Sequence, residues 1–441
     1  MIQQELSLRP ITYHKVTLGA LTRAGDALAE ITIYDADGQP TTRTLPVPAG
    51  LPGEIVTIAV EMPAPRTGKR RRHYKPRPPR VWITELHQPS PLRVEAACPV
   101  FGICGGCQLQ HMQYTAQLAW KRAIVDHLLR EVGQFADPPL RETIACDDPW
   151  HYRNHMRFSV NRDGQPGLTA RGTHRVLPLA ACPIAHEQIN RALVVLSRLP
   201  NPRPQALIRC GAATGQLLIQ PTPGEEARAQ LTAEGLDIHS DTMEERLGGQ
   251  TFRIRPSSFF QTNTMQAEKM ARLVLDGLLT GAEHGRDKSG PYTLVDAYCG
   301  VGTFALLLAH LHDKSGGHGR VIAIEESPSA ITDAQWNLRA ASNVEIMKGK
   351  VEDILPALTG QIDGLVIDPP RAGCQRSVLD ALAQHPVPRV VYVSCDPATL
   401  ARDLHILCHV HAAYRLLSVQ PLDMFPHTAH IECVTVLEHS A

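Results

Sequence analysis

The chain has 441 residues, of which 43% are hydrophobic and 20% are charged, so it is long enough for about three globular domains with more than one core. The 44 basic side chains balance the 44 acidic ones, and the net charge neither favours nor excludes a polyanionic partner. No apolar run approaches the roughly 18 residues that a membrane span needs, and residues 1–15 lack the basic start and apolar core of a signal peptide. We expect a cytoplasmic protein without a membrane partner.

Residues 12–62 alternate short β-type runs with turn signals rich in glycine and proline. The runs read HKVTLGALT, GDALAEITIYDADGQ, TTRTLPVPAGLPGE and IVTIAVEM. Closely spaced strands of this kind predict a small barrel, and a five-stranded oligonucleotide-binding barrel is one such architecture. The pattern alone fits other small β-modules equally well.

A basic block follows this module, between Glu61 and Glu85. It contains eight basic residues and no acidic one: Arg66, Lys69, Arg70, Arg71, Arg72, Lys75, Arg77 and Arg80. A local basic block in a neutral protein is typical of a phosphate-binding surface. A solvated loop is the alternative reading of such a charge run.

The 11 cysteines are odd in number, and without an export signal they argue against a disulfide framework. Cys98, Cys104 and Cys107 lie within ten residues and can meet at one metal centre. Cys182, which precedes a proline as Cys98 does, is the candidate fourth ligand. The pattern allows a zinc site or an iron–sulfur cluster.

Helices are expected at about 113–131, 185–198 and 263–279, with strand-like runs between residues 150 and 255. After residue 290, apolar strands alternate with helices, which predicts a doubly wound parallel sheet with both faces covered. The sequence thus predicts an α/β protein of three domains: a β-barrel with a basic extension (1–92), a central α+β domain with the metal loop (93–258) and a Rossmann-like domain (259–441).

Several polar residues follow predicted strands of this sheet, where ligands of open parallel sheets bind. Gly300 and Gly302 form a turn that leads into a helix, and Glu325 ends the next strand. An acid at that spacing can accept hydrogen bonds from ribose hydroxyls, as adenosylmethionine and dinucleotide sites both require. Asp368 and Cys395 end two later strands. A cysteine at the ligand edge indicates a reactive thiolate, with a buried packing residue as the alternative.

Five motifs together resemble the uracil-C5 RNA methyltransferases that use S-adenosyl-L-methionine. They are FFQTN (259–263), DAYCGVGTF (296–304), IDPPRAG (367–373), SCDPATLARD (394–403) and DMFPHTAHIE (423–432), in the family's order. Upstream, residues 12–62 resemble the family's TRAM module, and CPVFGICGGCQLQH (98–111) resembles its iron–sulfur loop. The subgroup that is most similar modifies bacterial 23S ribosomal RNA.

The resemblance implies roles for individual residues. Cys395 would be the nucleophile and Glu432 the general base. The cofactor contacts would come from Gln261, Tyr298, Gly300, Gly302, Thr303, Glu325 and Asp368. The four cysteines Cys98, Cys104, Cys107 and Cys182 would hold a 4Fe–4S cluster, with zinc less favoured. The expected partner is RNA, ribosomal RNA first, with the target uridine flipped out of its stack, and no obligate protein partner is expected.

Other functions stay open at this point. The substrate could be transfer RNA, since the same chemistry modifies both RNAs. The chain could instead be a non-catalytic RNA-binding or folding factor, although such a factor has no need of both Cys395 and Glu432. The glycine turn also fits a nicotinamide oxidoreductase with an iron–sulfur centre.

Overall fold

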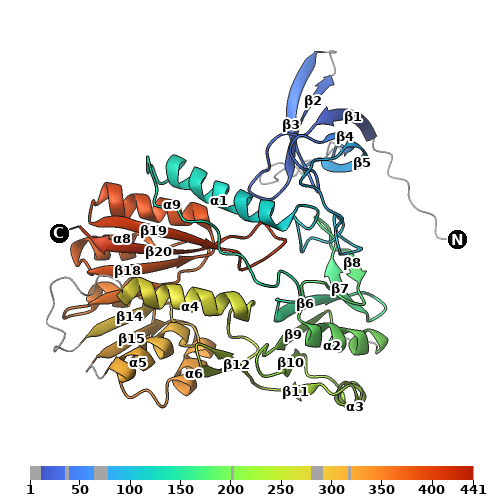
Figure 1. Cartoon of the computed structure of the whole chain (residues 1–441). Coiled ribbons are helices and arrows are strands. Elements are labelled where there is room, and N and C mark those ends of the chain that lie inside the picture. The colour runs from blue at the N-terminus through green and yellow to red at the C-terminus, as the bar shows by residue number, and fades with distance from the viewer. Residues whose placement is uncertain are drawn as a thin grey trace, which may run out of the picture. The chain divides into compact units, whose positions relative to one another are not determined.

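The computed structural model describes residues 11–34, 39–63, 78–199, 203–279, 292–315 and 319–440 (Figure 1). The chain divides into two compact units. One comprises Met1–Gln117 with His427–Ala429, and the other Leu118–Pro426 with His430–Ala441. The predicted domain boundaries at residues 92 and 258 stay predictions. Among the described residues, no helix has both the length and the apolar character needed to cross a bilayer.

The first unit contains the predicted β-module. Strands β1 (Ile11–Thr17), β4 (Ile55–Glu61) and β5 (Arg80–Gln88) form an antiparallel sheet, and β2 (Ala27–Tyr34) pairs with β3 (Pro40–Val47). Val56, Ile58 and Val60 alternate along β4 and are buried in one core with side chains of β2 and β3. Closure of these strands into a barrel stays a prediction.

The basic block lies largely outside the described residues. Of its eight members only Arg80 is described, at the start of β5. Its guanidinium lies 3.2 Å from the Glu61 carboxylate and 5.9 Å from the centre of the Trp82 ring.

The second unit begins within α1 (Tyr114–Glu131) and contains a six-stranded sheet of order β11-β10-β9-β6-β7-β8. Its strands are β6 (His155–Val160), β7 (Pro166–Thr169), β8 (Val176–Pro178), β9 (Gln205–Cys210), β10 (Gln216–Gln220) and β11 (Asp237–His239). Helices α2 (Glu187–Arg198) and α3 (Glu225–Ala233) and the hairpin of β12 (Met243–Leu247) and β13 (Gln250–Ile254) complete this region. The predicted helices near 113–131 and 185–198 are confirmed.

A seven-stranded sheet follows, with the order β16-β15-β14-β17-β18-β20-β19. Its strands are β14 (Thr293–Ala297), β15 (Arg320–Glu325), β16 (Val344–Lys348), β17 (Gly364–Ile367), β18 (Arg389–Ser394), β19 (Tyr414–Leu422) and β20 (Glu432–His439). The first five are parallel, whereas β20 is antiparallel to β18 and β19 is antiparallel to β20. The expectation of a parallel sheet is thus right for five strands and wrong for the two at this edge.

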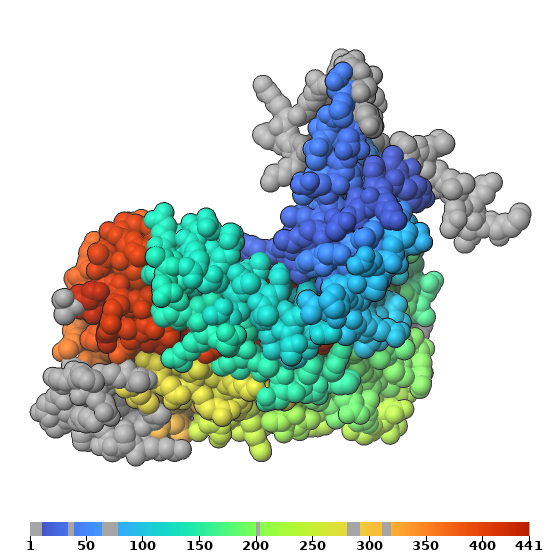
Figure 2. All heavy atoms as spheres, turned by 45° about the horizontal axis from the view of Figure 1, so that its top comes forward, coloured from blue at the N-terminus to red at the C-terminus, as the bar shows by residue number. Residues whose placement is uncertain are grey.

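Helices cover both faces of this sheet (Figure 1). One core contains side chains of α4 (Thr264–Leu279), α5 (Thr303–Ser315) and α6 (Pro328–Asn337). The other contains side chains of α1, α7 (Val351–Ile354), α8 (Arg376–Gln384) and α9 (Pro397–His405). A 3-10 turn (Leu355–Ala357) follows α7 and a π-helical turn (Ile406–Val410) follows α9. The outward sides of α1 (teal) and α4 (yellow) are visible in Figure 2.

The strands alternate between these two cores as a period of two requires. Along β17, Val366 joins the α4–α6 core, whereas Leu365 and Ile367 join the opposite one. The strand order reverses beside β14, whose neighbours are β15 and β17. In open α/β sheets the crevice at such a reversal, beyond the carboxyl ends of the strands, is where ligands bind.

Candidate active site at the carboxyl edge of the sheet

The turn after β14 is built from residues with left-handed backbone. Tyr298, Gly300 and Gly302 have φ angles of 66°, 57° and 85°. The Glu325 carboxylate fixes this turn, because it accepts hydrogen bonds from the Gly300 amide (2.9 Å) and the Ser327 amide (2.7 Å). Glu325, which the sequence analysis identified as a candidate cofactor contact, therefore holds the turn to the end of β15.

The two glycines of this turn differ in their surroundings. A side chain at Gly302 would come within 3.0 Å of Leu338 at the end of α6. A side chain at Gly300 would meet no heavy atom within 4 Å. Gly302 thus serves close packing, whereas Gly300 lines open space that a ligand can enter. Thr303 follows directly as the first residue of α5, so the amino end of that helix faces the same region.

Asp296 is a polar residue of this edge that is absent from the sequence-based set. It is fully buried, and one carboxylate oxygen accepts a hydrogen bond from the Ala305 amide (2.7 Å). Its other oxygen has no partner among the described residues. Burial raises the pKa of Asp296 well above its ordinary value, and the charges of Asp368 and Glu325 add to this effect. Its position as the first residue of DAYCGVGTF was the signal that could have identified it.

Cys395 and Glu432 lie next to each other because of strand register. Ser394 at the end of β18 pairs with Cys433 of β20. The next residues, Cys395 and Glu432, therefore lie across from each other on the other face of the sheet. Val391 and Val434, which share that face, belong to the core beneath α4–α6. Cys395 is half-buried, and Glu432 is only 4% exposed.

Asp368 joins this pair at the end of β17, where Pro369 and Pro370 prevent the strand from continuing. Burial raises the pKa of Asp368 to about 7. The alternation that directs Val366 toward α4–α6 directs Asp368 to the same face. The three side chains thus share one side of one sheet edge.

The charges of this group act on each other. Burial raises the pKa of Cys395 to about 11, the negative charges of Glu432 and Asp368 add to this, and the positive charge of Arg371 opposes it. Burial also raises the pKa of Glu432 well above its ordinary value; Asp368 adds to this and Arg371 again opposes it. Arg371, which was not singled out from the sequence, is therefore a cation that acts on both Cys395 and Glu432.

Gln261, the remaining predicted cofactor contact, lies on the loop between β13 and α4. Its backbone carbonyl accepts a hydrogen bond from the Asn154 side chain (3.1 Å). The buried Arg209 guanidinium donates to the carbonyls of Arg255 (3.0 Å) and Ser258 (2.5 Å), which fixes the start of this loop. Phe259 is 66% exposed, while Phe260 is buried.

The predicted metal ligands give a different result. In the part of the chain that the structure describes, none of these four cysteines forms a disulfide, and Cys98, Cys104 and Cys107 share one loop. Within the described ranges, no group of three histidine, cysteine or acidic side chains is arranged to hold a metal ion. The structure therefore does not support the predicted cluster.

The edge as a whole combines a glycine turn beside open space, a thiol, the buried carboxyl groups of Asp296 and Glu432, and the half-buried carboxyl group of Asp368. A thiol beside a carboxylate can add to an electron-poor carbon, and the carboxylate can accept a proton from the product. The turn leaves room for a ligand that lies close to its backbone, as ligands at this position of open α/β sheets do.

Comparisons with known proteins identify relatives of this chain. Residues 228–440 match the family model described as tRNA (Uracil-5-)-methyltransferase. A protein of Gloeobacter violaceus named as an uncharacterized RNA methyltransferase is 36% identical, over 96% of this chain and 96% of its own. One of Halalkalibacterium halodurans with the same description is 32% identical over 99% of each chain.

A solved structure shares the fold. The crystal structure of Pyrococcus abyssi tRNA (uracil-54, C5)-methyltransferase in complex with S-adenosyl-L-homocysteine matches with a TM-score of 0.67 and 23% identity. The match covers 96% of this chain and 99% of the other.

Proposed function

We propose that this chain, which belongs to the tRNA (uracil-5-)-methyltransferase family of RNA methyltransferases, transfers a methyl group from S-adenosyl-L-methionine to C5 of a uridine in structured RNA. The observation that supports this most strongly is the register that sets Cys395 across from Glu432 at the ligand edge of the sheet. Neither residue type is needed for binding RNA alone.

The residues of the edge fit S-adenosyl-L-methionine. Gly300 borders open space, and the unpartnered oxygen of the buried Asp296 is a ready acceptor for an N–H group. Tyr298, Gly300, Gly302, Thr303 and Glu325 would hold the donor at the turn, with Gln261 and Asp368 beside it. When bound, the sulfonium would supply an electrophilic methyl group.

The residues of this chain would perform the remaining steps. The Cys395 thiolate adds to C6 of the uracil, and the C5–C6 electron pair moves to C5 and the O4 enolate. C5 then takes the methyl group, and the electron pair of the broken methyl–sulfur bond stays on the departing sulfur. Glu432 removes the C5 proton, the C5–C6 double bond forms again, and the C6–sulfur bond breaks to free the thiolate.

The state of the thiol sets a condition for this sequence. Because its pKa is raised to about 11, Cys395 carries its proton at neutral pH and must give it up to solvent before it attacks. The pKa of Glu432 is raised as well, so this carboxyl group must be ionised when it accepts the C5 proton. The uridine must also leave its stack, since C6 is inaccessible within a helix.

Methyl transfer to RNA tests the proposal. RNA from a strain lacking the gene is incubated with tritiated S-adenosyl-L-methionine and the full chain, and the nucleosides are separated. We expect label in 5-methyluridine, abolished by Cys395→Ala and kept by Cys408→Ala, which removes a cysteine of the π-helical turn. Label in any other nucleoside, or full turnover by Cys395→Ala, would refute the proposal.

Ribosomal RNA is the first candidate substrate because the sequence motifs, with the TRAM-like and cysteine-rich segments, resemble that subgroup. Transfer RNA is the second, because the matching family and solved structure are named for it. Separate labelling of purified ribosomal and transfer RNA from the same strain distinguishes the two.

The 4Fe–4S cluster is proposed from the sequence alone, since the described residues contain no assembled ligand group. Cys98, Cys104 and Cys107 would supply three thiolates and Cys182 the fourth. Iron and acid-labile sulfide in anaerobically purified protein would support it, and Cys107→Ser should lower both. Zinc, or no metal at all, would rule it out.

A further inference from the structure

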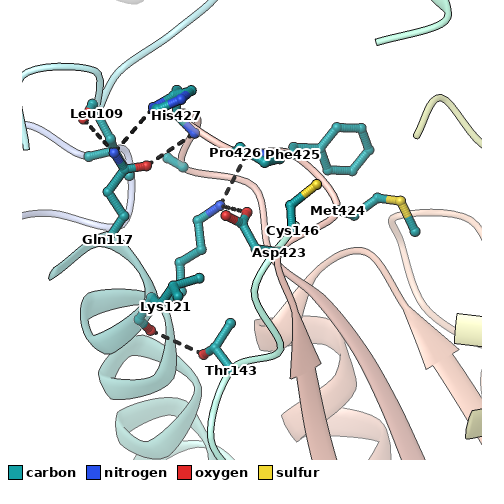
Figure 3. A network of polar contacts seen from close by, with 12 residues as sticks. Leu109, Gln117, Lys121, Thr143, Cys146, Asp423, Met424, Phe425, Pro426 and His427 are labelled. Carbon is teal, nitrogen blue, oxygen red and sulfur yellow. Dashed lines mark hydrogen bonds and ion pairs between the residues drawn. The ribbon is translucent and has the colours of Figure 1, made fainter. Parts of the chain in front are cut away.

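A buried ion pair holds the loop that joins β19 to β20. The Lys121 ammonium on α1 lies 2.5 Å from the Asp423 carboxylate, and both side chains are completely shielded from solvent. The same ammonium donates to the backbone carbonyl of Phe425 at 3.1 Å. Figure 3 shows Lys121 reaching from its helix to this loop.

Stability alone is a poor explanation for this pair. Moving both charges out of water costs free energy that their attraction recovers only when every remaining polar atom is satisfied. The second carboxylate oxygen of Asp423 has no partner among the described residues. Burial lowers the pKa of Lys121, against the opposing effect of Asp423.

The loop is held at four consecutive carbonyl groups by four different side chains. The carbonyl group of Asp423 accepts a hydrogen bond from the Gln266 side chain (2.9 Å) in the first turn of α4. The carbonyl group of Met424 accepts one from the Asn263 side chain (3.1 Å), just before α4. The carbonyl group of Phe425 accepts from the Lys121 ammonium, and that of Pro426 accepts from the Tyr152 hydroxyl (3.0 Å). Lys121 is the one of these four that also holds a loop side chain through an ion pair.

The held segment begins beside Glu432. Leu422, the last residue of β19, pairs with Glu432, the first residue of β20. Asp423 is therefore one residue from the strand pair that carries the proposed base. A displacement of Asp423 would shift Glu432 relative to Cys395, and misplacement of a reacting group by about 1 Å can cost about 100-fold in rate.

We propose that Lys121 is a positioning residue for proton removal, acting through its contacts with Asp423 and Phe425 to set Glu432 against C5 of the methylated uridine. This inference rests on the proposed function. It predicts a defect in one step, the breakdown of the methylated protein–RNA adduct, while adduct formation and donor binding continue.

The test is single-turnover kinetics with tritiated S-adenosyl-L-methionine and RNA from a strain lacking the gene. In Lys121→Met we expect adduct breakdown to slow about tenfold, so that labelled adduct accumulates on denaturing gels, while the KM for the donor stays within about twofold. Lys269→Met is the matched control, because Lys269 also bonds an aspartate (Asp147, 2.7 Å) and a backbone carbonyl (Ala145, 3.0 Å) but at the surface.

A double variant separates positioning from stability. Lys121→Met with Asp423→Asn removes both buried charges, so the fold should recover stability that the single variant loses, while the link to Phe425 stays broken. We expect near wild-type melting with slow adduct breakdown. Wild-type breakdown in the double variant, or equal slowing in Lys269→Met, would overturn the inference. A wild-type protein that forms neither adduct nor methyluridine would instead refute the proposed function.

Discussion

Cys395 directly follows β18 and Glu432 begins β20, and the register that pairs Ser394 with Cys433 brings these two residues to the same edge of the sheet although they lie far apart in the chain. The pairing depends on β20 running antiparallel to β18, because a parallel strand would carry its first residue to the opposite edge of the sheet. The edge strands thus bring a base to the side of the sheet where the thiol lies.

The charge of Glu432 should influence the ionisation of Cys395. Glu432→Gln removes a negative charge that helps to raise the pKa of Cys395 to about 11, so the pKa of the thiol should fall. The measurement is the pH dependence of iodoacetamide alkylation at Cys395, followed by peptide mass spectrometry. Glu438→Gln, at the far end of β20, should leave the midpoint unchanged. An equal midpoint in wild type and Glu432→Gln would contradict the coupling.

Asp368 should make stability depend on pH. Burial raises its pKa from the ordinary 3.8 to about 7 in the folded state, so the folded state binds more protons between these values and this group's contribution to stability falls as pH rises toward 7. The free energy of unfolding of Asp368→Asn, taken relative to that of wild type, should therefore rise by about 1–2 kcal/mol between pH 5 and pH 8, allowing for the partial exposure of Asp368. Chemical denaturation of both proteins at pH 5 and pH 8 measures this change. The same stability difference between variant and wild type at both pH values would refute the prediction.

The two glycines of the turn should respond differently to alanine. Gly302→Ala combines a φ of 85° with a contact of 3.0 Å to Leu338, so it should lower the free energy of unfolding by about 2–3 kcal/mol. Gly300→Ala meets only the backbone cost, about 1 kcal/mol, but places a methyl group in the proposed donor space. Calorimetry should show at least about tenfold weaker donor binding. Wild-type affinity in Gly300→Ala would place the donor elsewhere.

The basic block should add phosphate affinity. Replacing Arg70, Arg71 and Arg72 with serine should weaken RNA binding and reduce the slope of log affinity against log salt by about 2. Lysine at the same three positions keeps the charge and should keep the slope. Filter binding over a salt series checks this, and serine variants with the wild-type slope would show that the block does not touch RNA.

Part of this architecture could be predicted from the sequence because it is encoded locally. Apolar periodicity located α1, α2 and α4, and strand–turn–helix patterns located Gly300, Glu325, Asp368 and Cys395 at one edge. Strand direction is not encoded locally, so the antiparallel edge of the sheet was not foreseen. The strand β19 was also missed. Lys121 and Asp423 lie 302 positions apart, and no local pattern joins a lysine on a helix to a loop aspartate at that separation.

In the proposed reaction the sulfur of Cys395 is the atom that attacks the uracil ring, and mapping the protein–RNA adduct tests this most directly. The Glu432→Gln variant is incubated with S-adenosyl-L-methionine and RNA from a strain lacking the gene, digested with nuclease and protease, and examined by mass spectrometry. The peptide containing Cys395 should carry a methylated uridine nucleotide, which should vanish when Cys395→Ala is added. An adduct on another cysteine, or methylation by the Cys395→Ala protein, would contradict the account.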